Sequence, residues 1–103
     1  MLPMIARHGP AISAMCLRYQ VRRLEVFGSA ARQIDFDPDN SDVDFLVEFR
    51  SDQTPPSLAD FFAFRDSLAQ LLDRPVDLVM HSALRNPFLR ADIERSKETV
   101  YAA

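Results

Sequence analysis

Apolar residues recur at two spacings along this chain, and each spacing predicts a different kind of element. A recurrence every three to four residues is typical of a helix with one buried face, whereas alternation every second residue is typical of a strand. Short apolar runs between turn residues also favour strands. The pattern predicts helices over about 10–19, 57–72 and 87–96, and strands over about 24–27, 42–49, 76–80 and 99–101.

Capping and turn residues mark the ends of these elements. Ser57 with Asp60 three residues later resembles a capping box, and Asn86 before Pro87 marks the start of the last helix. A break at Pro75 ends the second helix. The other segments are predicted to be a loose N-terminal end (1–9), a polar hinge (20–23), a helical turn (29–32), a loop (33–41) and a connector (50–56).

The second helix contains an aromatic cluster, Phe61, Phe62 and Phe64, that is expected in the core. Phe64 lies off the apolar stripe of this helix, so contact with a partner is the alternative for it. The stripe consists of Leu58, Phe61, Phe62, Leu68, Leu71 and Leu72.

The order of the elements predicts one α/β domain, residues 1–103, built on a small sheet. A helix joins the strand over 42–49 to the strand over 76–80, so the usual crossover makes these two strands parallel. The strand over 24–27 returns through a loop, which favours an antiparallel arrangement beside the strand over 42–49.

This topology brings polar residues to one edge of the sheet. Asp42 and Asp44 open one parallel strand and point the same way, while the apolar residues that alternate with them face a core. Asp77 opens the other parallel strand, and Gly28-Ser29 ends the antiparallel one. We therefore expect three carboxylates and a Gly-Ser turn to converge.

Composition excludes several classes of function. The 103 residues are 48% apolar, enough for one core, and the net charge of −3 argues against broad nucleic-acid binding. The single cysteine, Cys16, forms neither an internal disulfide nor a cysteine zinc site, which favours a reduced, cytoplasmic setting. We expect no membrane span, because no apolar run approaches about 20 residues, and no signal peptide.

Three carboxylates at one edge repel one another unless a cation lies between them. Oxygen ligands suit Mg²⁺, and two such ions about 4 Å apart can activate an attacking oxygen and stabilise a leaving pyrophosphate. Asp42 and Asp44 would hold the metal ions, and Asp77 would complete the site and accept the proton of an incoming hydroxyl.

The Gly-Ser turn is a candidate cradle for phosphate groups. Gly28 allows close approach of the backbone, and Ser29 with the following N–H groups can hold phosphates at a helix start. Arg32, one turn further on, is either a phosphate ligand or an exposed charge.

Simpler interpretations compete with these assignments. Asp42 and Asp44 could be solvated residues at a strand start, although Asp77 interrupts an apolar run. The acidic stretch 35–39 invites a calcium loop, but the sequence after it alternates as a strand rather than as an EF-hand helix. Three arginines spaced five apart do not share one helical face and are interpreted as solvated charges: Arg85, Arg90 and Arg95.

These motifs resemble those of the DNA polymerase β-type nucleotidyltransferases. Residues 27–32, Phe-Gly-Ser-Ala-Ala-Arg, are similar to the hallmark turn of that family, and residues 41–47, Ser-Asp-Val-Asp-Phe-Leu-Val, to its metal strand. Asp77 matches the later carboxylate. The chain length and residues 86–93 resemble the minimal nucleotidyltransferases of bacteria and archaea, and the resemblance covers about 10–101.

Two features depart from the family pattern. Twelve residues, Ala30 to Ser41, separate Ser29 from Asp42, two more than is usual, and Gln33 stands where a glycine often follows the arginine. A surface loop accommodates two more residues at little thermodynamic cost.

The resemblance implies a nucleotidyltransferase fold, with a small mixed sheet and helices mainly on one face. It implies Mg²⁺-dependent transfer of AMP from ATP to a hydroxyl of a HEPN-type toxin, with this chain as the antitoxin in a hetero-oligomer. The alternatives are a non-catalytic antitoxin that neutralises its partner by occlusion, and a domain that senses nucleotide or metal. The implied site residues are Asp42, Asp44 and Asp77 for metal binding and catalysis, and Gly28, Ser29 and Arg32 for nucleotide binding.

Overall fold

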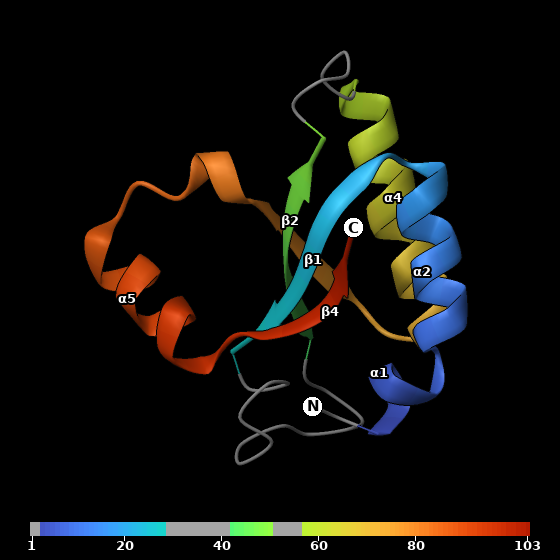
Figure 1. Ribbon diagram of the computed structural model, residues 1–103, viewed down its shortest axis with the longest axis horizontal. Coiled ribbons are helices and arrows are strands. Elements are labelled where there is room, and N and C mark those ends of the chain that lie inside the picture. Colours follow the sequence, from blue (N-terminus) through green and yellow to red (C-terminus); the bar gives the residue numbers. More distant parts are fainter. Residues whose placement is uncertain (1–2, 29–41, 51–56) are drawn as a thin grey trace.

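The computed structural model describes residues 3–28, 42–50 and 57–103 of the chain (Figure 1). The elements in chain order are α1 (Pro3–Arg7), α2 (Gly9–Arg18), β1 (Val21–Phe27), β2 (Val43–Phe49), α4 (Leu58–Leu72), β3 (Val76–Met80), the 3₁₀ turn η1 (His81–Ala83), α5 (Pro87–Ser96) and β4 (Glu98–Ala102). α2 and α4 lie together on one side of the sheet, and α5 lies on the other (Figure 1).

The described strands form one mixed sheet in the order β3-β2-β1-β4. β1 is antiparallel to β2 and β4, whereas β2 and β3 are parallel and are joined through α4. The predicted strand directions are therefore confirmed. The predicted edge strand over 99–101 is confirmed as β4, which pairs with β1 alone.

The main core lies between the sheet and the pair α2 and α4. Alternate residues of β2 point into it, because side chains along a strand change face at every residue. Burial raises the pKa of the Cys16 thiol to about 12, so this side chain stays protonated and packs as an apolar group. The fully buried residues of this core include Ile12, Cys16, Leu24, Val26, Val43, Phe45, Val47, Phe64 and Leu68.

Local capping chemistry sets the helix starts as predicted. The Ser57 side chain accepts a hydrogen bond from the Asp60 amide at 3.1 Å, which satisfies a donor that the first turn of α4 would leave unpaired. The Asn86 side chain does the same for α5, with Pro87 in its first turn. Asp73 ends α4 in the left-handed conformation, at φ 54°.

The first strand begins earlier than the sequence pattern predicts. β1 starts at Val21, so the expected polar hinge over 20–23 is wrong. The pairing of β1 with β2 shifts register between Val21 and Arg23, which is the signature of a β-bulge. Because the bulge adds one residue, two consecutive arginines face solvent between the buried Val21 and Leu24, and the alternation is lost.

The N-terminal segment is also more ordered than predicted. Residues expected to be a loose end form the short helix α1, and its Ile5 is fully buried in the main core. Met4 is partly buried against the same core. The helix is too short for a recognisable helical period.

Phe64 belongs to the core, so its alternative as a partner contact is wrong. It is fully buried, and its ring lies 5.4 Å from the Tyr19 ring and 6.4 Å from the Phe49 ring, measured between centroids. The buried residues of α4 are Phe64, Leu68 and Leu72. Leu68 and Leu72 belong to the expected stripe, and Phe64 adds to it. Phe62, which was assigned to that stripe, is 39% exposed.

Three predicted segments, the helical turn over 29–32, the loop over 33–41 and most of the connector over 50–56, lie outside the described residues. None of the helices in the described part of the chain combines the length and the apolar character that a membrane crossing requires.

The second face of the sheet carries a smaller buried layer beneath α5. Leu46 of β2 and Ile93 of α5 are 2% and 1% exposed. Glu25 of β1 is buried beside them in the sheet, and its carboxylate lies 3.3 Å from the Nζ of Lys97, the only lysine of the chain. Lys97 also lies 3.0 Å from Glu94, so one ammonium group ties the end of α5 to β1.

We predict that Phe64→Ala lowers the free energy of unfolding by about 3–5 kcal/mol, because it opens a cavity among the aromatic rings of the core. The matched variant is Phe62→Ala, which removes a partly exposed ring that contacts Arg65 at the surface. Its expected cost is about 1 kcal/mol. Urea denaturation followed by circular dichroism measures both, and equal losses would contradict the assignment of the buried stripe.

We predict that Lys97→Met costs about 3 kcal/mol of stability, because it leaves the Glu25 carboxylate buried without its cation. The double variant Glu25→Leu/Lys97→Met removes both charges and is expected to unfold within about 1 kcal/mol of the wild type. The two unfolding curves in urea at pH 7 decide this. A double variant no more stable than Lys97→Met would show that the ion pair is not the cause.

The same pair predicts a pH dependence in the alkaline range. The hydrogen bond to Glu94 and then the charge of Glu25 raise the pKa of Lys97 above its usual 10.5. The stabilisation is therefore complete below pH 10.5 and is lost as the pH rises through the higher folded-state value.

Candidate nucleotidyl-transfer site

Three neighbouring strands place Phe27, Asp44 and Asp77 in one row across the sheet. Phe27 at the end of β1 faces Asp44 in the antiparallel pair, and Asp44 faces Asp77 in the parallel pair. Residues that face each other on adjacent strands lie on the same side of the sheet, about 5 Å apart. Two carboxylates are thus neighbours beside the end of β1.

The alternation of β2 decides which side of the sheet these carboxylates occupy. Val43 and Phe45, on either side of Asp44, are fully buried against α2 and α4. Asp44 must therefore lie on the opposite face, the one that α5 partly covers (Figure 1). It is half-buried there, and Asp77 is exposed.

Asp42 precedes β2 by one residue and is exposed. The next residue, Val43, donates its amide hydrogen to the carbonyl of Pro75 at 3.2 Å and pairs with Val76, which fixes the start of β2 against the start of β3. Asp42, two residues before Asp44, lies at the same end of the sheet as Asp77.

Gly28 forms the turn directly after β1, beside Asp44. Its φ is +70°, in the left-handed region, where a Cβ atom clashes with the backbone. A Cβ added to Gly28 would lie only 2.6 Å from the Oδ2 atom of Asp44. The backbone conformation therefore favours glycine, and any larger residue would make the Asp44 carboxylate shift.

Four of the six predicted site residues, Gly28, Asp42, Asp44 and Asp77, are thus brought together at one end of the sheet. The other two, Ser29 and Arg32, lie outside the described residues. The chemical roles predicted for all six stay predictions.

The donor set fits a hard divalent cation in its chemistry. Asp42, Asp44 and Asp77 offer carboxylate oxygens only, and the Asp44 carboxylate lies directly against the Gly28 turn. Over residues 3–28, 42–50 and 57–103, no three acidic, histidine or cysteine side chains are gathered closely enough to form a metal centre. The strands therefore place the three aspartates at one edge of the sheet. Their carboxylate groups would have to turn toward a common ion to bind it.

The ion pair of Glu25 and Lys97 lies on the same face of the sheet and was not predicted. Glu25 stands two residues before Phe27, so the two side chains share a face with Asp44. The available signals were an acidic residue inside the apolar run of β1 and a solitary lysine at the end of the last helix.

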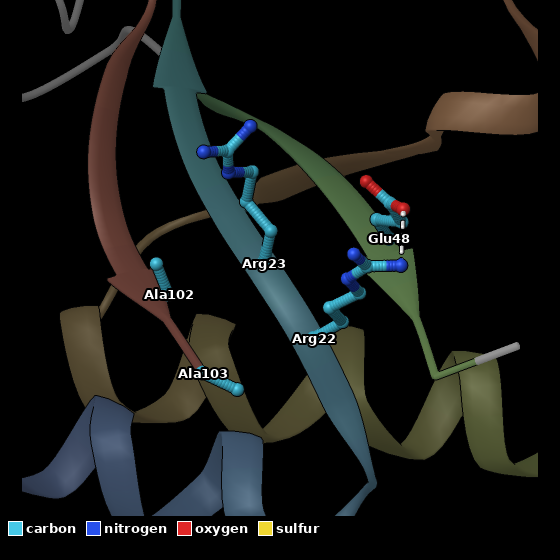
Figure 2. A pocket seen from close by; sticks show the side chains of 5 residues that line it. All are labelled: Arg22, Arg23, Glu48, Ala102 and Ala103. Carbon is cyan, nitrogen blue, oxygen red and sulfur yellow. Dashed lines mark ion pairs between the residues drawn. The ribbon is translucent and has the colours of Figure 1, made fainter. Parts of the chain in front are cut away.

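A pocket of about 190 Å³ lies at the other end of the sheet (Figure 2). Arg22 and Arg23 of the bulged start of β1 line it together with Glu48, and Arg22 pairs with Glu48 at 3.7 Å. Figure 2 shows Ala102 and Ala103 on its other side. The length of β1 separates this pocket from Asp44, so it is not part of the carboxylate edge.

The sequence was compared with family models and with curated proteins. A family model described as a nucleotidyltransferase domain matches residues 11–100. A Methanocaldococcus jannaschii protein named, provisionally, a protein adenylyltransferase is 42% identical over 77 residues, which are 75% of this chain and 74% of that protein. The protein adenylyltransferase MntA of Thermococcus cleftensis is 38% identical over 84 residues, 82% and 77% of the two chains.

The structure resembles solved structures over almost its whole length. One, described provisionally as a minimal nucleotidyltransferase, has a TM-score of 0.72 and 31% identity, and the match covers 90% of this chain and 89% of the other. Another contains a tri-AMPylated Shewanella oneidensis HEPN toxin in complex with an MNT antitoxin. The matched chain has a TM-score of 0.66 and 17% identity, with 96% and 73% coverage, which shows a shared fold.

We predict that Gly28→Ala lowers stability by about 1–2 kcal/mol, because alanine is strained at this positive φ. It also forces the Asp44 carboxylate out of its place beside the turn. Gly9→Ala is the matched control, since a Cβ there meets nothing within 4 Å, and it is expected to stabilise by about 0.5 kcal/mol. Thermal unfolding of both variants checks the difference. A Gly28→Ala protein as stable as the wild type would contradict it.

Proposed function

This chain belongs to the nucleotidyltransferase domain family, and from that premise we propose that it transfers AMP from ATP to a side-chain hydroxyl of a partner protein. The predicted enzyme class, a nucleotidyltransferase, is confirmed by this membership. The observation that carries the finer proposal is the facing of Asp44 and Asp77 beside the Gly28 turn. The curated relatives named protein adenylyltransferases support a protein as the acceptor.

The carboxylates of Asp42, Asp44 and Asp77 would hold Mg²⁺ at the open end of the sheet. When bound, Mg²⁺ would neutralise the charge of the triphosphate and of the leaving pyrophosphate. Gly28, whose missing side chain leaves room beside Asp44, would let the phosphates approach the backbone. Ser29 and Arg32 would bind the phosphate oxygens, as the sequence motif implies.

The reaction exchanges the phosphoanhydride link between the α- and β-phosphates of ATP for a phosphoester link to the acceptor. The acceptor oxygen forms a bond to the α-phosphorus of ATP, and the bond from this phosphorus to the bridging oxygen breaks, so pyrophosphate leaves. The hydroxyl proton passes to a carboxylate, for which we assign Asp77. Its exposed position at the start of β3 allows an acceptor held by another protein to reach it.

The partner we propose is a HEPN-type toxin, with this chain as its antitoxin in a cytoplasmic complex. Support comes from the solved complex of a tri-AMPylated Shewanella oneidensis HEPN toxin with an MNT antitoxin, whose matched chain shares this fold. The small size of the domain also favours a partner, because 103 residues leave little surface for gripping both nucleotide and acceptor.

We predict that Asp44→Asn lowers the rate of AMP transfer at least about 100-fold, because a neutral amide cannot hold the cation that stabilises the transition state. The control is Asp66→Asn, which alters an exposed carboxylate on α4 whose partner among the described residues is the neighbouring Arg65. The measurement is radiolabel transfer from α-labelled ATP to the purified toxin, with Mg²⁺ and with a chelator.

Loss of label in the Asp44 variant alone is the expected result. If the wild-type protein transfers no label and still suppresses toxicity, the enzymatic proposal fails and neutralisation by occlusion takes its place. Equal transfer by wild type and the Asp44 variant would show that this carboxylate is not part of the site.

A further inference from the structure

The first turn of α5 presents two large apolar side chains to solvent. Phe88 is 85% exposed and Leu89 is 44% exposed. Two large apolar side chains next to each other in one turn and open to solvent are typical of a surface that another molecule covers.

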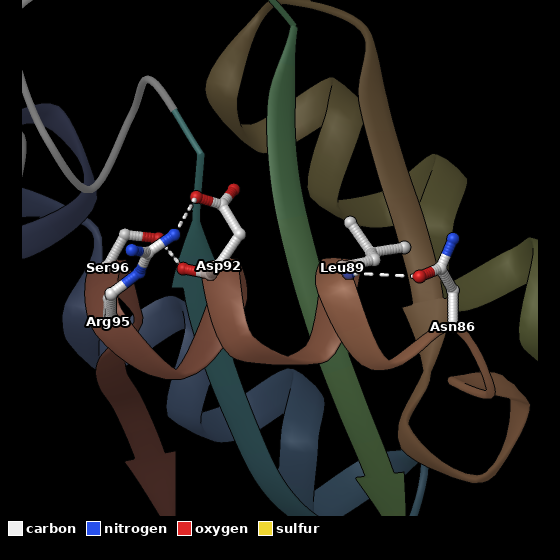
Figure 3. Close-up of polar contacts among 5 residues, drawn as sticks. All are labelled: Asn86, Leu89, Asp92, Arg95 and Ser96. Atoms are coloured by element: carbon white, nitrogen blue, oxygen red, sulfur yellow. Dashed lines mark hydrogen bonds and ion pairs between the residues drawn. The ribbon is translucent and has the colours of Figure 1, made fainter.

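Hydrogen bonds and a proline restrict the backbone that carries this apolar pair. The Asn86 side chain accepts hydrogen bonds from the amides of Phe88 at 2.9 Å and Leu89 at 3.3 Å, and Figure 3 shows the second of these at the start of the helix. Pro87 in the first turn further restricts the backbone. A side chain displayed on a capped turn loses little backbone entropy on binding, which favours a recognition role.

The charges on α5 are divided between its two halves. In the C-terminal half, Arg95 pairs with Asp92 at 3.4 Å, and Lys97 pairs with Glu94 and with the buried Glu25 (Figure 3 shows the first pair). The cations of that half are thus neutralised within the chain.

The other half differs. Arg85 precedes α5 by two residues and Arg90 lies in its first half, so they stand on either side of Phe88 and Leu89 in the sequence, and both are exposed. Within the part of the chain that the structure describes, neither guanidinium group has a hydrogen bond or an ion pair. Two available cations therefore border the apolar pair, on a chain whose net charge is −3.

We propose that Arg85, Phe88, Leu89 and Arg90, the α5 surface, bind an acidic protein partner, whose carboxylates pair with the arginines and whose apolar recess receives Phe88. The inference rests on the proposed function, and the partner is the protein that accepts AMP. Charge complementarity selects an acidic partner, since an arginine on either side of an apolar centre matches carboxylates around a hydrophobic recess.

Nucleic acid fits this surface less well. An aliphatic side chain such as Leu89 offers no flat face on which a base can stack. The position of the surface fits the proposed chemistry. α5 lies over the face of the sheet that carries Asp44, so a partner bound to α5 is held on the face where transfer occurs (Figure 1).

The test measures binding and transfer separately with the purified toxin. Phe88→Ser and Arg90→Glu are each expected to weaken binding at least about 10-fold in calorimetric titration. The salt dependence of binding should also fall in Arg90→Glu, because one ion pair is removed. The matched control is Leu58→Ser, which alters a leucine that is 71% exposed at the start of α4 and is expected to bind within about twofold of the wild type.

Transfer kinetics give an independent readout. The α5 variants should need at least about 10-fold more toxin for half-maximal labelling yet reach the wild-type rate at saturation, because no reacting group is changed. Asp44→Asn should show the reverse, with binding retained and the saturated rate lost. Unfolding midpoints equal to the wild type are expected for Phe88→Ser, since the ring is exposed.

Three outcomes overturn the proposal. If the wild type transfers AMP and the α5 variants bind as well as Leu58→Ser, the function stands and the surface is wrong. If the α5 variants lose only self-association in sedimentation, or only binding to an oligonucleotide, the occupant is a second copy or a nucleic acid. If the wild type neither binds nor labels the toxin, the proposed function itself fails, and this surface fails with it as its docking site.

Discussion

The alternation of β2 is the constraint on which the rest of this structure depends. Its odd positions, Val43, Phe45 and Val47, are fully buried against α2 and α4, and a slip of one residue would expose all three. The free-energy cost of such a slip holds Asp44 on the opposite face of the sheet. The parallel register with β3 then brings Asp77 beside it. One strand, β2, thus contributes apolar side chains to the main core on one face and Asp44 to the carboxylate edge on the other.

The second face of the sheet is built differently, and α5 shows how. Its C-terminal half is bound to the sheet by Ile93 and by the pair of Glu25 with Lys97, so this end of the helix cannot move without unburying a carboxylate. Its N-terminal half is fixed by its own cap and leaves Phe88 exposed. One helix thus combines an end that is anchored to the sheet with an exposed apolar end, and the anchor sets the orientation of the proposed docking surface.

Most of the fold could be predicted because long periodic segments carry redundant signals. The helix over 57–72 has a cap, a break and an apolar stripe, and the nucleotidyltransferase fold expected from the motifs is confirmed. The failures share one cause, which is that tertiary contacts act on single residues. A bulge removes the alternation around Val21, and contacts of Met4 and Ile5 with the core hold α1 in place. Phe64 is fully buried although it lies outside the expected stripe of α4.

The candidate site was predictable to the extent that topology determines it. Asp44 and Asp77 follow from strand order, because parallel strands bring their starts to one edge, whereas the ion pair of Glu25 required knowledge of which face α5 covers. In the proposed reaction, this small domain has to obtain part of its site from elsewhere. Its carboxylates lie at an open edge, so the acceptor must be positioned by contacts outside that edge. An exposed apolar pair with two available arginines, on the same side of the sheet, is the part of the described chain suited to provide those contacts.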